Sequence, residues 1–284
     1  MLLIPKLGLG YQNIPKIATT SIFAWLYQAH GETPNDDPII QNHNRNFFLR
    51  QFKVDSLEEV RRAEGGYLRF ALVRDPVLRF LSMYGNRVVA KGKLGRASRD
   101  AERVLSAGLP LNPQLNDLIN SLDGYLAASR AVAHHARRQS ELLGPDLTVY
   151  DHLLDISEAD RLLPLIRQHW RTHGMYEALA NADEHFPRLQ TDGPKIGLEG
   201  LSRRSFDRLL EHYQSDYEAI PALDQDAIKA RFVAENGGSN LFFHDFSEPG
   251  TLRQGLVKRA QEIRKLFSQV ARKLTRIGRW RSRT

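Results

Sequence analysis

The chain of 284 residues contains no cysteine. This absence excludes a disulfide framework and any zinc site built from thiolates, and it suits a reducing compartment. No segment approaches about 18 uninterrupted apolar residues, so we expect no membrane-spanning helix. Residues 1–10 also lack the basic start and the apolar core of a secretory signal peptide. Together these absences predict a cytoplasmic protein.

Excess positive charge is absent from most of the chain. The net charge is +7, but residues 251–284 contain eleven lysines and arginines against one acid, Glu262. Residues 1–250 therefore carry a net charge of −3, which argues against specific nucleic-acid binding there. We expect one domain over residues 1–250 and a basic C-terminal tail over residues 251–284.

A strand, a polar turn and an amphipathic helix follow one another twice in the first hundred residues. Residues 11–14 form the first predicted strand, and residues 67–73 form the second. After the second strand, Asp75 and Pro76 are typical of a helix N-cap and first position, and they predict a helix to about Ala90. Later segments add a strand and two helices, over residues 147–150, 158–173 and 205–217.

Strands that alternate with helices favour a parallel sheet with helices on both faces. In such sheets, ligands bind at the carboxyl ends of the strands. We therefore expect an α/β fold of three layers, similar to the P-loop fold, with both polar turns at its ligand-binding edge. An amphipathic helix in the tail completes the prediction.

The first turn and the start of its helix have the sequence Ile14-Pro15-Lys16-Ile17-Ala18-Thr19-Thr20-Ser21. Unpaired backbone N–H groups at a helix start, three hydroxyls and an ammonium group together suit a phosphate or a sulfate. The same residues also suit an ordinary helix start beside a solvated lysine, because serine and threonine are common N-caps. The segment lacks the GxxxxGK[ST] spacing of a Walker A loop, which argues against an NTPase.

The second turn begins with Arg74 at the end of a predicted strand, and Ser82 follows two turns into the next helix. A guanidinium and a hydroxyl in these positions can bind one phosphate from two sides. Taken separately, each residue is better explained without a ligand: Arg74 by pairing with Asp75 or a carbonyl, and Ser82 by a solvated helix face.

In this order, each after a strand, the two segments resemble the sulfotransferases that use 3′-phosphoadenosine-5′-phosphosulfate (PAPS). Pro15-Lys16-x-x-x-Thr-Ser resembles their 5′-phosphosulfate motif, and Arg74-(x)7-Ser82 resembles their 3′-phosphate motif. The carbohydrate branch, with Golgi enzymes and bacterial counterparts, is the most similar. Further similar segments begin at His135, Tyr150, His185 and Tyr213, so the resemblance covers about residues 11–220. The chain departs from the pattern at Ala18 and in lacking the transmembrane anchor of the Golgi enzymes.

The resemblance implies a soluble bacterial enzyme that transfers a sulfuryl group from PAPS to a hydroxyl of a glycan or glycolipid, without a metal. Lys16 then contacts the bridging oxygen of the donor, while Arg74 and Ser82 bind its 3′-phosphate. The 5′ side of the donor is expected to contact Pro15, Lys16, Ala18, Thr19, Thr20 and Ser21.

A general base for the acceptor hydroxyl is expected among the histidines. His43, which lies between the two motifs, is the first candidate because a related group of glycan enzymes has a base histidine there. A turn histidine without a catalytic role explains it equally well. His135 is the second candidate, and its alternative role is to orient a substrate loop.

The tail repeats apolar residues at steps of three, four or seven among its basic residues, which predicts an amphipathic helix. Two interpretations are equally supported. The helix either binds an anionic membrane surface, as a peripheral protein of the inner membrane, or packs on its own domain or on a second copy in a homodimer. The alternative function is a nucleotide-binding or membrane-associated scaffold without transferase activity, against which the presence of Lys16, Arg74 and Ser82 together argues.

Overall fold

The structure is a computed structural model that describes residues 1–33, 38–63, 66–189 and 193–236. The predicted tail and its amphipathic helix, over residues 251–284, lie outside the described residues. The proposed division of the chain at residue 250 therefore stays a prediction.

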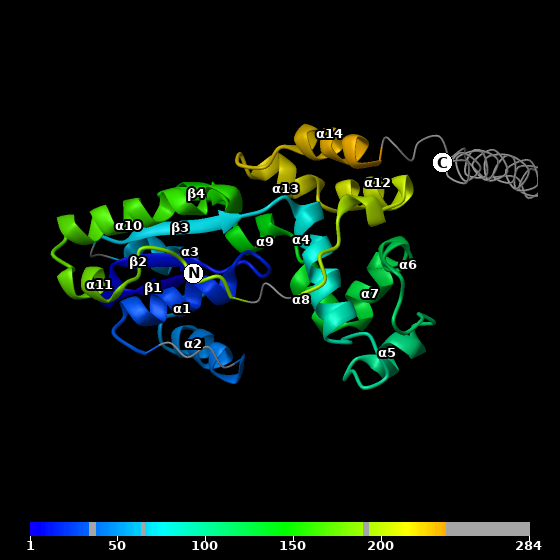
Figure 1. Cartoon of the computed structure of the whole chain (residues 1–284), viewed down its shortest axis with the longest axis horizontal. Helices are drawn as coiled ribbons and strands as arrows, with labels where there is room; N and C mark the ends of the chain where they lie inside the picture. The colour runs from blue at the N-terminus through cyan, green and yellow to red at the C-terminus, as the bar shows by residue number, and fades with distance from the viewer. Residues whose placement is uncertain (34–37, 64–65, 190–192, 237–284) are drawn as a thin grey trace, which may run out of the picture. The chain divides into compact units, whose positions relative to one another are not determined.

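A four-stranded mixed sheet forms the centre of the fold (Figure 1), and its strands are β1 (Leu2–Ile4), β2 (Leu9–Gln12), β3 (Leu68–Val73) and β4 (His152–Asp155). Their order is β1-β2-β3-β4, and the β2–β3 and β3–β4 pairs are parallel. The predicted α/β fold is confirmed. Strand β1 is antiparallel to β2 because a single turn of 3₁₀ helix, Pro5–Leu7, reverses the chain before Gly8. Gly8 has a φ of 54°, a conformation that glycine adopts without strain.

Two of the predicted strands are displaced in the structure. Strand β2 begins two residues earlier than expected, at Leu9. The predicted strand over residues 147–150 was wrong, because Leu147–Val149 forms a 3₁₀ turn and β4 begins at His152. The physical reason is local: the carboxylate of Asp146 accepts a hydrogen bond from the Thr148 N–H at 2.9 Å, which favours a turn over an extended chain.

The two helices that follow β2 and β3 are α1 (Thr19–Ala29) and α4 (Pro76–Met83). The predicted start of α4 is confirmed, since Asp75 accepts a hydrogen bond from the Leu78 N–H at 2.9 Å and Pro76 is its first residue. The helix continues to Ala90 as predicted, but the segment Tyr84–Ala90, η2, is a π-helix. Such segments are rare and occur frequently at functional sites.

The remaining helices flank the sheet and extend beyond it (Figure 1). Helix α10 (Ala159–Thr172) lies above the sheet in this view, and α1 lies below it. The long predicted helix at 205–217 is two helices, α12 (Arg203–His212) and α13 (Gln214–Ala219). The others are α2 (Pro38–Gln51), α3 (Leu57–Arg62), α5 (Ala101–Ser106), α6 (Leu115–Asn120), α7 (Leu122–Ala128), α8 (Arg130–Ala136), α9 (Gln139–Leu143), α11 (Tyr176–Asn181) and α14 (Gln225–Asn236).

The buried side chains form two hydrophobic clusters. One surrounds the sheet, where Trp25 of α1 stacks on Trp170 of α10 at 5.4 Å between ring centroids. The other surrounds α4 and η2 and is helical throughout, with Phe80 and Leu118 fully buried in it. Residue Arg74 joins β3 to α4, and so connects the first cluster to the second.

Candidate active site

A cavity of about 780 Å³ lies at the carboxyl ends of β2 and β3. It is bounded by the loop before α1, by α1 itself, and by parts of α2, α4, η2 and α8. Every site residue that the sequence indicated lines it except His43. The lining residues are Asn13, Pro15, Lys16, Ala18, Thr19, Thr20, Ser21, Phe23, Arg45, Leu49, Arg74, Ser82, Arg87, Lys91, Lys93, His134, His135 and Leu189.

The loop before α1 has an unusual backbone. Lys16 and Ala18 have φ values of 72° and 46°, in the left-handed region that non-glycine residues rarely adopt. Such residues cost about 1–3 kcal/mol each and cluster at ligand sites. The Thr19 hydroxyl donates to the Ile14 carbonyl at 2.9 Å and closes the loop.

Helix α1 begins at this loop without a side-chain cap. The first helical hydrogen bond there runs from the Ile22 N–H to the Ala18 carbonyl. The N–H groups of Thr19, Thr20 and Ser21 therefore have no acceptor within the helix. Together with the positive end of the helix dipole, they make this edge of the cavity suited to an anion.

Lys16 extends the same anion site with a partly buried ammonium group. Burial, together with the neighbouring positive charges of Arg87, Lys91 and Arg74, lowers the pKa of Lys16 to about 8. A bound anion relieves both effects, because it replaces lost hydration and compensates the repulsion.

Arg74 faces the cavity from the second loop, and its guanidinium is left available for a ligand. The nearby carboxylate of Asp75 accepts hydrogen bonds from the Leu78 N–H at 2.9 Å and from the Tyr217 hydroxyl at 2.7 Å. No ion pair joins Arg74 to a carboxylate in the part of the chain that the structure describes. Burial lowers the pKa of Arg74, while Asp75 and Asp155 partly offset this.

The main chain of Arg74 is bound by the buried amide of Gln139. The Gln139 Oε1 accepts from the Arg74 N–H at 3.1 Å, and its Nε2 donates to the Arg74 carbonyl at 2.8 Å. Asp216 in turn accepts from the N–H groups of Gln139 and Ser140, at 2.9 and 2.8 Å. Neither Gln139 nor Asp216 is exposed to solvent. The segments around Gln139 and Asp216 therefore position the loop that carries Arg74.

His135 lines the cavity from the end of α8 and is 8% exposed. Burial lowers its pKa to about 2, assisted by the positive charges of Arg87, His134 and Lys16. The ring is therefore neutral, and its buried Nδ1 has no hydrogen-bond partner. The carbonyl of His135 accepts a hydrogen bond from the fully buried Arg79 at 3.0 Å, which fixes the end of α8 against α4.

His43 lies on α2, so the alternative interpretation of His43 as a turn residue was wrong. Its side chain is exposed and approaches the ring of Tyr27 edge-on at 6.3 Å between centroids, and it does not line the cavity. The sequence analysis did not predict this helix, whose Phe48 is fully buried in the sheet cluster. The catalytic role of His43 stays a prediction, and its side chain does not line the cavity.

The charge of the cavity is of one sign. Its charged lining residues are six cations, Lys16, Arg45, Arg74, Arg87, Lys91 and Lys93, with no carboxylate among them. A cavity walled by protein that carries charge of one sign concentrates ions of the opposite sign. The site is therefore built for a ligand with several negative charges.

Residues 1–219 match the sulfotransferase family. The chain belongs to this family. Its reaction is accordingly a sulfuryl transfer. No curated protein and no solved structure matched the chain.

Several residues of this sulfotransferase's cavity were missed by the sequence reasoning. Arg45 comes from α2, Arg87 from η2, and Lys91 and Lys93 from the segment after it. Arg87 follows Ser82 by five residues and lies on the π-helix, whose i→i+5 bonding points side chains in directions that an α-helical pattern does not predict. The basic residues at 87–93 were visible in the sequence, but the sequence did not show that their side chains line the cavity.

Two further observations concern the expected absences. Among the described residues, no helix is both long and apolar enough to cross a membrane. Within the same residues, no group of three or more histidine, aspartate or glutamate side chains is arranged to hold a metal ion. The predictions of a metal-free reaction and of a cytoplasmic location stay predictions.

Proposed function

We propose that this sulfotransferase takes its sulfuryl group from PAPS and transfers it to a hydroxyl of a glycan or glycolipid. The observation that carries the proposal is the placement of two separate anion-binding loops on one cationic cavity. One consists of Lys16 and the start of α1, and the other of Arg74 and Ser82. PAPS has negative charge at both its 5′ and its 3′ positions, which is what two such loops require.

Each loop then has its own task. The N–H groups of Thr19, Thr20 and Ser21 and the hydroxyls of Thr20 and Ser21 suit the 5′-phosphosulfate, while the Thr19 hydroxyl holds the loop closed. The Lys16 ammonium suits the oxygen on which charge develops as the nucleotide leaves. Pro15 and Ala18 shape this loop through the backbone. Arg74 and Ser82 suit the 3′-phosphate, so they select PAPS over ATP, which lacks that group.

We assign the role of general base to His135 because it is the buried histidine at the cavity with a ring nitrogen free to accept a proton. Its pKa is low because the ring is buried and faces the positive charge of Arg87. A bound polyanion reduces that charge effect and raises the pKa toward the range useful for catalysis. His43 remains the alternative, although its exposed side chain does not line the cavity.

The donor proposal is tested by calorimetric titration with adenosine 3′,5′-bisphosphate, which has both phosphates and cannot react. We expect tight binding, at least tenfold weaker binding of ATP, and a loss of about 100-fold in affinity on Arg74→Ala, because a charge-assisted bidentate contact disappears. Arg204→Ala on α12 is the matched control, since it removes one exposed arginine that does not line the cavity. Equal affinity for ATP and the bisphosphate contradicts the proposal.

The glycan or glycolipid acceptor is supported by the resemblance to the carbohydrate branch. A transfer assay with radiolabelled donor against saccharides, lipids and tyrosine peptides tests it directly. Transfer to the peptides alone contradicts it.

The tail retains both of its interpretations as proposals. A flotation assay with anionic liposomes compares the full chain with one that ends at Gly250. Flotation of the full chain alone supports a peripheral membrane anchor at residues 251–284. A homodimer that dissociates when the tail is removed supports packing on a second copy instead.

A further inference from the structure

A carboxylate lies beside the arginine assigned to the 3′-phosphate, yet the two side chains do not pair. Burial lowers the pKa of Arg74, and the charge of Asp75 partly offsets this, so the two groups lie within electrostatic reach of each other. No ion pair joins them among the residues that the structure describes. A guanidinium binds a carboxylate and a phosphate through the same two parallel hydrogen bonds. Asp75 is therefore a potential competitor of the phosphate for Arg74.

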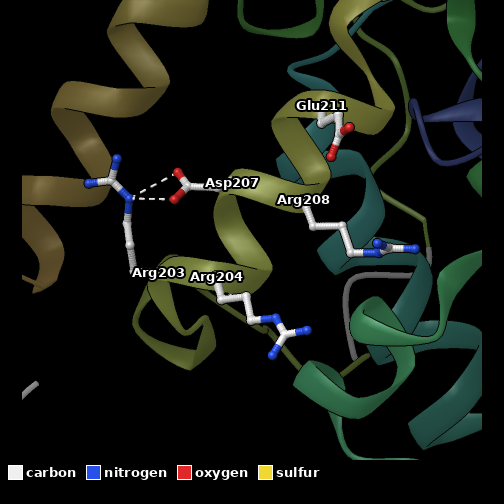
Figure 2. A pocket seen from close by; sticks show the side chains of 5 residues that line it. All are labelled: Arg203, Arg204, Asp207, Arg208 and Glu211. Atoms are coloured by element: carbon white, nitrogen blue, oxygen red, sulfur yellow. Dashed lines mark hydrogen bonds and ion pairs between the residues drawn. The ribbon is translucent and has the colours of Figure 1, made fainter. Parts of the chain in front are cut away.

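The hollow on α12 contains the opposite case. Figure 2 shows Arg203 donating to both oxygens of Asp207, at 2.9 and 2.8 Å, so that this carboxylate is occupied by the arginine. Both side chains there are exposed, and water weakens the attraction between them. Arg74 and Asp75 are half-buried, where opposite charges attract more strongly. The lack of a pair at Arg74 therefore requires a cause.

The cause is that each oxygen of Asp75 has another donor. Oδ1 accepts a hydrogen bond from the Leu78 N–H at 2.9 Å, and Oδ2 accepts one from the Tyr217 hydroxyl at 2.7 Å. The first bond is the ordinary cap of helix α4. The second comes from a residue 142 positions further along the chain. Burial, together with the negative charge of Asp75, raises the pKa of Tyr217, so its hydroxyl stays protonated and able to donate.

The position of Tyr217 is built into the fold. It lies on α13 directly after the buried Asp216, which accepts a hydrogen bond from the Gln139 N–H at 2.9 Å. Its side chain packs against the hydrophobic cluster around α4. Two neighbouring residues of α13 thus act on the same loop. Asp216 acts through Gln139 on the main chain of Arg74, and Tyr217 acts on the side chain of Asp75.

We propose that Tyr217 is a positioning residue for donor binding: by donating to Asp75, its hydroxyl leaves the Arg74 guanidinium free for the 3′-phosphate. The inference rests on the proposed function, because it takes Arg74 as the ligand of that phosphate. Without the hydroxyl, Oδ2 of Asp75 becomes available to Arg74, and the phosphate must displace it. If Asp75 then holds the guanidinium for about nine tenths of the time, the phosphate binds about tenfold more weakly.

The test is calorimetric titration of the full-length protein with adenosine 3′,5′-bisphosphate and with adenosine 5′-monophosphate, which lacks the 3′-phosphate. Tyr217→Phe retains the ring and removes the hydroxyl. We expect it to weaken the bisphosphate about tenfold and to change the monophosphate less than threefold, because the loss acts through Arg74. Tyr125→Phe is the matched control and should change neither, since its hydroxyl donates to the Pro110 carbonyl at 2.7 Å in the same hydrophobic cluster.

A second substitution separates competition for Arg74 from altered packing. Asp75→Asn retains an oxygen that can cap α4 and removes the charge that attracts Arg74. Alone, it should bind the bisphosphate within threefold of the unmodified protein. Combined with Tyr217→Phe, it should restore bisphosphate affinity to within threefold of the unmodified protein. A loss of affinity caused by altered packing alone is not restored in this way.

The outcomes separate this inference from the donor proposal. Equal weakening of both nucleotides in Tyr217→Phe, or no recovery with Asp75→Asn, overturns the inference. If Arg74→Ala weakens the bisphosphate and Tyr217→Phe does not, the donor proposal stands and Tyr217 has no part in positioning Arg74. If the unmodified protein binds the bisphosphate no more tightly than the monophosphate, the 3′-phosphate is not recognised and both proposals fail.

Discussion

The side chain of Gln139 accepts a hydrogen bond from the Arg74 N–H and donates one to the Arg74 carbonyl. The amide thus acts as a template for the backbone at the end of β3, although the two residues are 65 positions apart in the chain. A short loop between a strand and a helix has several accessible conformations. The Gln139 contact selects the one in which the Arg74 side chain lines the cavity.

We expect Gln139→Leu to reduce affinity for adenosine 3′,5′-bisphosphate about tenfold, although residue 139 does not line the cavity. The variant leaves the N–H and carbonyl of Arg74 unpaired and also lowers the free energy of unfolding by about 1–3 kcal/mol. Titration calorimetry gives the affinity and urea unfolding gives the stability. Normal affinity in a destabilised Gln139→Leu protein shows that the contact stabilises the fold without positioning Arg74.

Asp216→Asn should destabilise the protein by about 2–3 kcal/mol. The buried carboxylate accepts three hydrogen bonds, from the N–H groups of Gln139 and Ser140 and from the Ser140 hydroxyl. An amide has a single acceptor oxygen, and its NH₂ group would face one of these donors. Urea unfolding measures the loss. Asp207→Asn on α12 is a control with an exposed ion pair, and its effect should stay within about 1 kcal/mol.

Arg79→Met should lower stability by about 2–4 kcal/mol and also reduce turnover. The buried guanidinium donates to the carbonyls of His135 and Arg137, and a methionine of similar length leaves both without a partner. The end of α8, with His135, then loses its fixed position against α4. A variant with reduced stability but unchanged kcat shows that Arg79 has no influence on the position of His135.

The affinity for adenosine 3′,5′-bisphosphate should fall as pH rises through about 8. The pKa of Lys16 in the empty site is about 8 because of burial and neighbouring cations, and the anion binds the protonated ammonium. Above that pH, binding requires proton uptake, so the dissociation constant rises by up to tenfold per pH unit. Lys16→Arg, whose side chain stays charged, should remove this dependence between pH 7.5 and 9.5. Titration at constant ionic strength measures it, and an unchanged pH profile in Lys16→Arg assigns the effect to another group.

The same pKa has the opposite consequence for the stability of the empty protein. Lys16 has a lower pKa folded than unfolded, so the unfolded chain holds more protons between about pH 8 and pH 10.5. The contribution of Lys16 therefore makes the empty protein more stable as pH rises through that window. Urea unfolding of the unmodified protein and of Lys16→Met isolates this contribution.

His135→Asn should reduce kcat by about 10²- to 10⁴-fold, with bisphosphate affinity changed less than threefold. His43→Asn should leave kcat within about twofold, because its exposed ring does not line the cavity. Rapid-quench measurement of a single turnover separates the chemical step from product release. A large loss in His43→Asn with normal His135→Asn reverses the assignment of the base.

Much of the site was predictable because many of the residues that line it belong to two contiguous segments of the sequence. Asp75 and Pro76 mark the start of α4, and the run from Pro15 to Ser21 marks the loop before α1, whatever the rest of the chain does. Prediction failed where local propensity was ambiguous. Residues 147–150 have the apolar composition of a strand, but one capping contact from Asp146 makes them a turn.

The sequence by itself determined the two polar loops at the sheet edge, their order, and the strand-to-helix connections in which they lie, since short-range steric and capping preferences decide these. Only the tertiary structure decided which other residues join them. The bonds from Gln139 to Arg74 and from Asp216 to Gln139 span 65 and 77 residues, and no local pattern encodes such contacts. Likewise, packing alone brings Arg45 from α2 and Arg87 from η2 into one cavity, and leaves His43 outside it.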